Sequence, residues 1–327
     1  MTHAGLYCTP GAFYVDPNTP VARAVITHGH GDHARCGHGV VLATRETLAI
    51  MASRYGDDHA RTVQPLGYGE PLTIGDVRLR LVPSGHILGA CQVVLEHNGQ
   101  RVVISGDYKR RRDPTCPAFE AVACDVFVTE ATFALPVFCH PPAEGEIARL
   151  LGSLRIFPDR AHLVGVYALG KCQRVLGLLR EAGYDRPIYL HGALKPLTDL
   201  YQSFGLEFGE LRSIAEEAKD DLKGEIVLCP PSALGDRWTR RLPDPLPAVA
   251  SGWMRVRARA RQRGAELPLI LSDHADWNEL LQTLDDVGAP EIWVTHGEEQ
   301  ALIYAAEQKG FKAIALDLLG REEDDGE

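Results

Sequence analysis

The sequence has no long hydrophobic run and no excess of positive charge. None of its apolar stretches approaches the ~20 residues that span a membrane. Its N-terminus does not join a basic region to a hydrophobic one, as a secretory signal would. We therefore expect a cytoplasmic protein with no membrane partner.

The sequence also has no CxxC pair, although it contains 8 cysteines. Their scatter along the chain is neither that of a disulfide framework nor that of a thiolate zinc site. The composition of the 327 residues, 45% hydrophobic and 24% charged, excludes disorder as the main state. This length allows one large domain or about two domains.

The pattern of predicted elements changes near residue 140. The first part reads as short strands, at residues 12–15, 23–27, 77–82, 92–96, 101–105 and 125–129. After residue 140, strands and helices alternate: helices from 143 and 171 and at 195–203, and strands at 162–166, 187–190 and 225–229. This order is typical of βαβ units around a parallel sheet.

The last third of the chain returns to mixed elements. The Pro-rich residues 241–250 are interpreted as a connection. A helix is expected from Asp276, because the apolar residues that follow share one face and Asp276 and Glu279 have the spacing of a capping box. Residues 313–319 read as a strand, and residues 321–327 as a solvated acidic tail.

The segment ITHGHGDHA, residues 26–34, is the strongest chemical motif. It follows a buried type of strand and supplies His28, His30, Asp32 and His33, with glycines that allow a tight turn. Imidazole and carboxylate groups are ligands suited to zinc, manganese or iron. His86 and Asp107 also follow predicted strands, which makes them further candidate ligands.

This order of motifs, HxHxDH followed by a lone His and a lone Asp, resembles the metallo-β-lactamase fold, a four-layer αβ/βα sandwich. The resemblance implies two divalent metals, zinc in the first place and manganese as an alternative. It implies that one metal is held by His28, His30 and His86, and the second by Asp32 and His33, with Asp107 as the bridge. Asp16 would support the metal histidines from behind.

Three later motifs, VTEATF, LSDHAD and WVTHGE, narrow the resemblance. They place Glu130, His274 and His296 at strand ends, with the βαβ segment inserted after the first. This resembles the β-CASP nucleases, most of all the bacterial DNA-ligase-associated exonucleases related to the crosslink-repair nucleases. By analogy, His296 completes the second metal's ligands.

The same resemblance implies three segments. These are a first metallo-β-lactamase part at 1–140, a β-CASP cap domain of parallel βαβ units at 141–264, and a return segment at 265–327.

The resemblance also implies hydrolysis of a phosphodiester. Two metals can lower the pKa of a bridging water toward about 7 and stabilise charge on a phosphoryl group. We expect a metal-bound hydroxide to attack, with Asp107 able to accept its proton. His274, oriented by Glu130, would donate a proton to the leaving oxygen or contact the phosphate, unless it is only a solvated residue beside a helix.

Several cationic residues could bind the substrate. GVYALGKC nearly matches a phosphate loop, but Cys172 replaces the Ser or Thr that would hold magnesium, so we expect Lys171 to bind substrate phosphate without a motor function. Arg110 and Arg255 represent two basic clusters, 109–112 and alternate residues of 255–263, that form either a polyanion track or solvated surface. His191 ends a strand and is either a substrate contact or a plain strand-end residue.

The leading hypothesis is a DNA exonuclease in repair, with an ATP-dependent DNA ligase and a helicase of the same pathway as partners. An RNA-processing nuclease of the same fold stays open, because His296 is also typical of that branch. A small-molecule metallo-hydrolase is less favoured, since the inserted unit with its cations is superfluous for a small neutral substrate. A metal-free binding module is disfavoured because every ligand position is filled.

Overall fold

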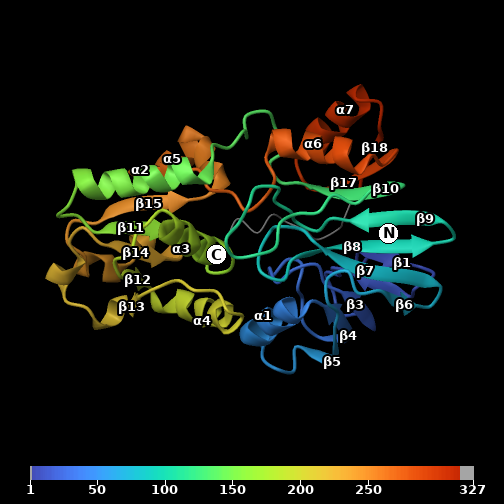
Figure 1. Ribbon diagram of the computed structural model, residues 1–327, viewed down its shortest axis with the longest axis horizontal. Helices are drawn as coiled ribbons and strands as arrows, with labels where there is room; N and C mark the ends of the chain where they lie inside the picture. The colour runs from blue at the N-terminus through green and yellow to red at the C-terminus, as the bar shows by residue number, and fades with distance from the viewer. Residues whose placement is uncertain (1, 317–327) are drawn as a thin grey trace. The chain divides into compact units, whose positions relative to one another are not determined.

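The computed structural model describes residues 2–316 and shows two compact units (Figure 1). Unit 1 contains residues 2–137 and 274–316, and unit 2 contains residues 138–273. Residues 317–319, which end the predicted last strand, and the acidic tail lie outside the described residues. Within the described range, no helix is both long and apolar enough to cross a membrane.

Unit 1 is built on two sheets. The first has the order β1-β2-β3-β4-β5, with β1 (Leu6–Cys8), β2 (Phe13–Val15), β3 (Arg23–Val25), β4 (His38–Ala43) and β5 (Ala60–Pro65). The second has the order β18-β17-β10-β9-β8-β7-β6, with β6 (Leu72–Ile74), β7 (Val77–Pro83), β8 (Cys91–His97), β9 (Gln100–Ile104), β10 (Val126–Ala131), β17 (Glu291–Gly297) and β18 (Lys312–Ala315). The strands from β9 to β18 are parallel, and those from β6 to β9 are antiparallel.

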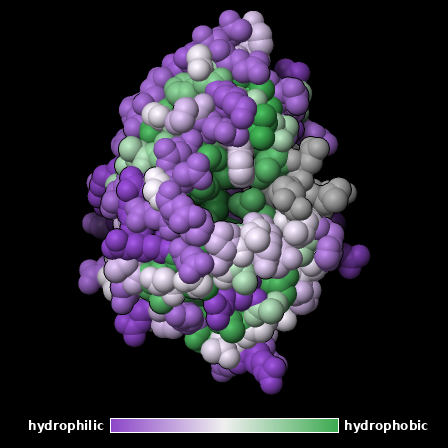
Figure 2. Space-filling model, turned by 90° about the vertical axis from the view of Figure 1, so that its right-hand side faces the viewer, coloured by the Kyte–Doolittle hydropathy of each residue, from purple (hydrophilic) through white to green (hydrophobic). Residues whose placement is uncertain are grey.

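Three helices and three apolar clusters complete unit 1. The helices are α1 (Arg45–Tyr55), α6 (Trp277–Val287) and α7 (Glu299–Gln308). One cluster joins α1 to the first sheet, a second joins the two sheets, and a third joins the second sheet to α6 and α7. This mixed α/β architecture is the one expected from the resemblance. Figure 2 shows a face of unit 1 on which apolar residues gather in a central hollow surrounded by polar ones.

Sequence patterns explain the elements near the site. β7, a predicted strand, alternates in burial: Leu79 and Leu81 are buried in the cluster between the sheets, whereas Arg78 is exposed. The predicted helix at Asp276 is confirmed. The Asp276 side chain accepts from the Glu279 N–H at 3.1 Å, and the Glu279 side chain accepts from the Asp276 N–H at 3.0 Å.

The sequence patterns did not predict β4, α1 and β5. Only one of the six residues of β5 is fully buried, so the strand lacks the alternation that marks a half-buried strand. Its strand conformation depends on parallel pairing with β4. This part of the fold is therefore set by a neighbouring strand rather than by its own pattern.

Unit 2 contains one parallel sheet in the order β13-β12-β14-β11-β15-β16, which confirms the predicted βαβ arrangement. Its strands are β11 (His162–Gly165), β12 (Ile188–Leu190), β13 (Leu211–Ser213), β14 (Ile226–Cys229), β15 (Leu246–Ala250) and β16 (Leu267–Leu269). Its helices are α2 (Ala143–Ile156), α3 (Lys171–Glu181), α4 (Lys195–Ser203) and α5 (Arg257–Gln262). Short 3₁₀ helices are η1 (Gly192–Leu194), η2 (Ile214–Glu216), η3 (Lys219–Leu222), η4 (Pro231–Gly235), η5 (Arg237–Arg241) and η6 (Gly252–Arg255).

The interpretation of residues 241–250 as a connection was wrong for their second half. Residues 246–250 form β15, which pairs with β11 on one side and β16 on the other. Pro247 is tolerated there because its carbonyl accepts from the Glu266 N–H, so its missing donor faces the turn before β16 begins.

The predicted domain boundaries at 140/141 and 264/265 can be compared with the two units. In the structure, residues 265–273 belong to unit 2, because β16 pairs with β15 of that sheet. The boundaries that the resemblance implies stay predictions about the family's domains.

We expect Gly288→Ala to destabilise unit 1. Gly288 ends α6 at φ 59°, in the left-handed region, and an added Cβ would meet nothing within 4 Å. The expected cost of about 1–2 kcal/mol is therefore a backbone cost alone. Denaturant unfolding of Gly288→Asn is the control, because Asn tolerates this conformation better. Equal losses for the two variants would contradict this account.

Candidate metal centre

A tight loop after β3 carries the first four candidate ligands. Gly29 of this loop packs against helix α1, and a Cβ at Gly29 would lie 2.5 Å from the Ile50 Cγ2 atom. Glycine is therefore required for the close approach. His28 and His33 in this loop are almost completely buried.

All seven residues predicted as metal ligands meet beside this loop. Their ligand atoms fall into groups within 4.8 Å of one another: His28, His30, His86 and Asp107; His28, Asp32 and His33; and His33, Asp107 and His296. His86 follows β7, Asp107 follows β9 and His296 lies in β17. Strand ends from both sheets thus supply the cluster.

Asp107 lies where these groups overlap. Its Oδ2 atom is 3.3 Å from His28 Nε2, 3.5 Å from His33 Nε2 and 3.8 Å from His86 Nε2. The carboxylate is only 3% exposed, so water does not screen these contacts. One carboxylate therefore links the histidines of both predicted metal positions.

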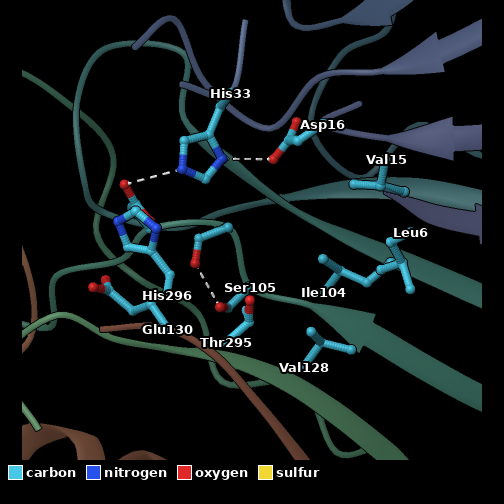
Figure 3. A pocket seen from close by; sticks show the side chains of 12 residues that line it. Leu6, Val15, Asp16, His33, Ile104, Ser105, Val128, Glu130, Thr295 and His296 are labelled. Carbon is cyan, nitrogen blue, oxygen red and sulfur yellow. Dashed lines mark hydrogen bonds and ion pairs between the residues drawn. The ribbon is translucent and has the colours of Figure 1, made fainter. Parts of the chain in front are cut away.

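Hydrogen bonds behind the histidines fix which ring nitrogen faces Asp107. The Thr27 hydroxyl donates to Asp16 Oδ2 at 2.6 Å, so its oxygen accepts from His28 Nδ1 at 3.1 Å. His33 Nδ1 donates to the same Asp16 oxygen at 2.8 Å (Figure 3). In each neutral imidazole the Nε2 lone pair therefore points toward Asp107.

This arrangement fits a divalent cation. A lone pair facing a carboxylate oxygen is repulsive unless a positive charge lies between them. Within the described part of the chain, His28 Nε2 and Asp107 Oδ1 are buried atoms that make no hydrogen bond. Neutral imidazoles and carboxylates are also ligands that zinc accepts.

The protonation states agree with metal ligation. Burial, and then the neighbouring His28, lower the pKa of His30 to about 3. Burial also lowers the pKa of His86 far below its ordinary value and lowers the pKa of His296. For Asp107, burial raises the pKa, but the nearby His33 and His28 outweigh it and hold it well below the usual range. His30, His86 and His296 are therefore neutral near neutral pH, and the Asp107 carboxylate is ionised.

His296 reaches the cluster through an irregularity in β17. The parallel register with β10 shifts after Glu130, which pairs with Thr295, whereas Ala131 pairs with Gly297. His296 is the extra residue and has φ 62°. Its ring centroid lies 5.8 Å from that of His33. The bulge therefore turns a side chain into the cluster that regular alternation would place differently.

Glu130 and His274 form a second pair at the cluster. His274 Nδ1 lies 2.8 Å from Glu130 Oε2, and the other Glu130 oxygen accepts from the Tyr108 N–H at 2.7 Å. The His274 ring centroid is 4.7 Å from that of His86. The His274 side chain is 21% exposed, whereas that of Glu130 is 2% exposed. The histidine is thus held by a buried carboxylate while its ring reaches solvent.

A buried ion pair holds the loop that carries His86. Lys109 Nζ donates to the His86 carbonyl at 3.1 Å and lies 2.5 Å from Asp113 Oδ2. The backbones of Gly85 and Lys109 are also in close contact, because a Cβ at Gly85 would be 2.3 Å from the Lys109 carbonyl oxygen. Lys109 belongs to the basic cluster 109–112, but its side chain is 1% exposed. Lys109 therefore stabilises the His86 loop from the interior of the protein.

The structure also places the predicted substrate residues. Lys171 is buried at the start of α3, with its Nζ 2.9 Å from Asp273 Oδ2. Arg110 pairs with Asp286 and donates to Thr283 at 3.1 Å. His191 lies beyond β12 in unit 2. Arg255 is exposed at the end of η6. Their predicted contacts with substrate stay predictions.

The alternate arginines of residues 255–263 do not share one face in the structure. Residues 257–262 are helical, so alternate residues spread around the helix instead of sharing one face. Arg259 stacks on Trp253, with its Cζ 3.9 Å from the ring centroid. A single basic stripe is therefore not present among the described residues of this segment.

Thr27 and Lys109 are site residues that the sequence motifs missed. Thr27 directly precedes His28, so the motif THGHGDH contained the signal, but its role depends on Asp16, eleven positions earlier. Lys109 resembled a surface cation in a basic run. Only its burial shows that it supports the His86 loop.

Comparisons with known proteins agree with this fold. Residues 268–315 match the family described as RMMBL, the Zn-dependent metallo-hydrolase RNA specificity domain. A probable DNA ligase from Opitutus terrae is 29% identical over 319 residues, which cover 95% of this chain and 30% of that protein. Endoribonuclease YSH1 from Mycosarcoma maydis is 24% identical over 90% of this chain and 43% of its own length.

A crystal structure of a protein of unknown function from Enterococcus faecalis V583 has a similar fold. It superposes with a TM-score of 0.62 at 14% identity, over 90% of this chain and 79% of that one. These matches support the metallo-β-lactamase/β-CASP nuclease family as the family that this chain resembles. It spans less than half the length of the two curated relatives.

We expect Lys109→Met to cost about 3 kcal/mol or more of unfolding free energy, because it removes the cation that pairs with the buried Asp113 carboxylate. Lys309→Met is the matched control in unit 1. It breaks a pair with Asp285 at 2.9 Å in which both side chains are more than one-third exposed, Lys309 at 35% and Asp285 at 52%. That loss should stay below about 1 kcal/mol. Equal losses in urea unfolding would contradict the role of the buried pair.

Proposed function

We propose that this chain is a divalent-metal-dependent nuclease that hydrolyses DNA phosphodiesters, acting from strand ends in DNA repair. The observation that carries the proposal is the sharing of Asp107 by histidines of two adjacent groups, beside a histidine held by Glu130. Two metal sites with a common carboxylate are typical of phosphodiester hydrolysis. The DNA assignment is supported by the 29% identical relative named a probable DNA ligase.

The proposed metal ligands form two sets, each of which would hold one zinc ion and both of which would include Asp107. His28, His30 and His86 would hold one ion, and Asp32, His33 and His296 the other, with Asp107 between them. When bound, the two ions would act as Lewis acids toward a phosphoryl oxygen and neutralise charge that develops in the transition state. Asp16 and Thr27 keep the Nδ1 hydrogens occupied, so that Nε2 of His28 and His33 stays a ligand atom.

His274 is proposed as the proton donor. Its Nδ1–H donates to Glu130, so a second proton on the ring resides on Nε2, where it can pass to the leaving oxygen. The negative charge of Glu130 stabilises the imidazolium before the transfer. Lys171, Arg110, His191 and Arg255 remain proposed contacts to the nucleic acid.

An RNA-processing nuclease is the second candidate. It is favoured by the RNA specificity domain matched at residues 268–315 and by the endoribonuclease YSH1 relative. For the DNA reading, we propose a DNA ligase, and a helicase of the same pathway, as partners. The name of the Opitutus protein supports the ligase partner.

Asp107→Asn should slow cleavage strongly in a test with end-labelled DNA and RNA strands of the same sequence, supplied with zinc or manganese. We expect the parent protein to shorten DNA from its end and the variant to lose about 10²–10³-fold or more of the rate. Asp58→Asn, at an exposed position, is the control and should keep full activity. Faster cleavage of RNA would favour the second candidate, and undiminished cleavage by Asp107→Asn would rule out this site.

His274→Ala should lower kcat by about 10²–10⁴-fold while the protein keeps its metal. The reason is that this residue supplies a proton and is not among the proposed ligands. Single-turnover cleavage together with elemental analysis makes the measurement, and His3→Ala, at an exposed histidine, is the control. Full turnover by His274→Ala would remove the residue from the mechanism.

A further inference from the structure

Unit 2 contains a pocket that the mechanism above does not use. It has a volume of about 160 Å³ and lies beyond the carboxyl ends of β12 and β13, where His191 and Ile214 follow these strands. Ligands of open parallel α/β sheets bind outside the carboxyl ends of the strands. The volume is below the ~300–1,000 Å³ of pockets for drug-sized ligands, which suits one ring system.

One wall of the pocket is aromatic. The rings of His191 and Trp238 lie with their centroids 5.2 Å apart at 46°. Trp238 Nε1 donates to the Ala233 carbonyl at 3.0 Å, which fixes the indole on the pocket lining. Leu222 and Ile214 are buried and close the apolar side of the pocket. A planar ring can therefore stack here without disturbing a hydrogen bond.

The polar groups of the pocket have complementary roles. His191 Nδ1 accepts from the Ala193 N–H at 3.2 Å, so the neutral ring carries its hydrogen on Nε2 and offers a donor. The Glu217 carboxylate, 18% exposed, is an acceptor, with its nearest cation, Arg212, 4.0 Å away. Arg241 is exposed on the pocket lining and forms no ion pair with any described residue. The pocket thus offers a donor, an acceptor and a free positive charge.

We propose that this pocket binds a single nucleotide unit of an unpaired nucleic-acid strand. The base stacks on Trp238 and His191, its edge pairs with His191 Nε2–H and Glu217, and its phosphate contacts Arg241. A purely apolar ligand would leave the His191 donor and the Glu217 acceptor unsatisfied, whereas a base carries both acceptors and amino donors on its edge. This inference rests on the proposed nuclease function and adds a base-binding site in unit 2.

The test uses the metal-loaded full chain and two ligands without a phosphodiester bond, dAMP and deoxyadenosine, so that no turnover occurs. Calorimetry measures binding to the parent protein and to Trp238→Leu, His191→Asn and Arg241→Gln. Asn at position 191 can still accept the Ala193 N–H as a cap. Arg237→Gln is the control, because Arg237 is exposed on the same 3₁₀ helix and does not line the pocket.

We expect Trp238→Leu to weaken both ligands by about 5- to 100-fold, the range for loss of one base–aromatic stack. Arg241→Gln should weaken dAMP to the affinity of deoxyadenosine and leave deoxyadenosine unchanged. Arg237→Gln should bind like the parent. If the Trp238 and Arg241 variants bind both ligands with the affinity of the parent, as they would if the ligands bound at the metal centre, the inference is overturned.

Cleavage of labelled strands separates this inference from the proposed function. If the parent cleaves DNA and the Trp238 and Arg241 variants bind dAMP like the parent, the pocket inference fails and the nuclease assignment stands. If dAMP binding follows the expected pattern but neither DNA nor RNA is cleaved, the nucleotide site stands and the nuclease assignment fails.

Discussion

The structure of the candidate site depends on one electrostatic conflict. A buried Asp107 carboxylate faces the Nε2 atoms of three histidines at 3.3–3.8 Å. For His28 and His33, the Nδ1 hydrogens are committed elsewhere, so lone pairs confront a negative oxygen. Such a cluster is stable only with a positive charge among its atoms. The donor set of this cluster therefore fits a divalent cation.

Much of unit 1 holds Asp107 and these histidines close together. The ligands come from the ends of β3, β7 and β9 and from a bulge in β17, so both sheets contribute to the cluster. Buried side chains also form hydrogen bonds that orient residues of the cluster. Asp16 bonds to His33, Glu130 bonds to His274, and Lys109 donates to the His86 carbonyl. Because these partners are buried, the ring orientations are set before any ligand arrives.

Charge distribution bears on nucleic-acid binding. The basic run 109–112 is not a free cationic surface, since Lys109 pairs with Asp113, Arg110 with Asp286 and Arg111 with Asp276. These residues fasten the loop after β9 to its surroundings in unit 1. Other cations are exposed, and Arg241 and Arg255 of unit 2 are among them. A count of basic residues in a run is thus a weak guide to a binding surface.

Local spacing in the sequence was enough to indicate the four candidate ligands of residues 26–34, the α6 cap and the parallel sheet of unit 2. These features depend on alternate residues of one loop, a capping box, and strands that alternate with helices. Tertiary structure alone decided β5, the strand at 246–250, the bulge at His296 and the roles of Thr27 and Lys109. Each of these depends on a partner distant in the chain, such as β4 for β5 or Asp113 and His86 for Lys109. A local pattern carries no record of such partners, whereas burial and hydrogen bonding in the folded chain make them decisive.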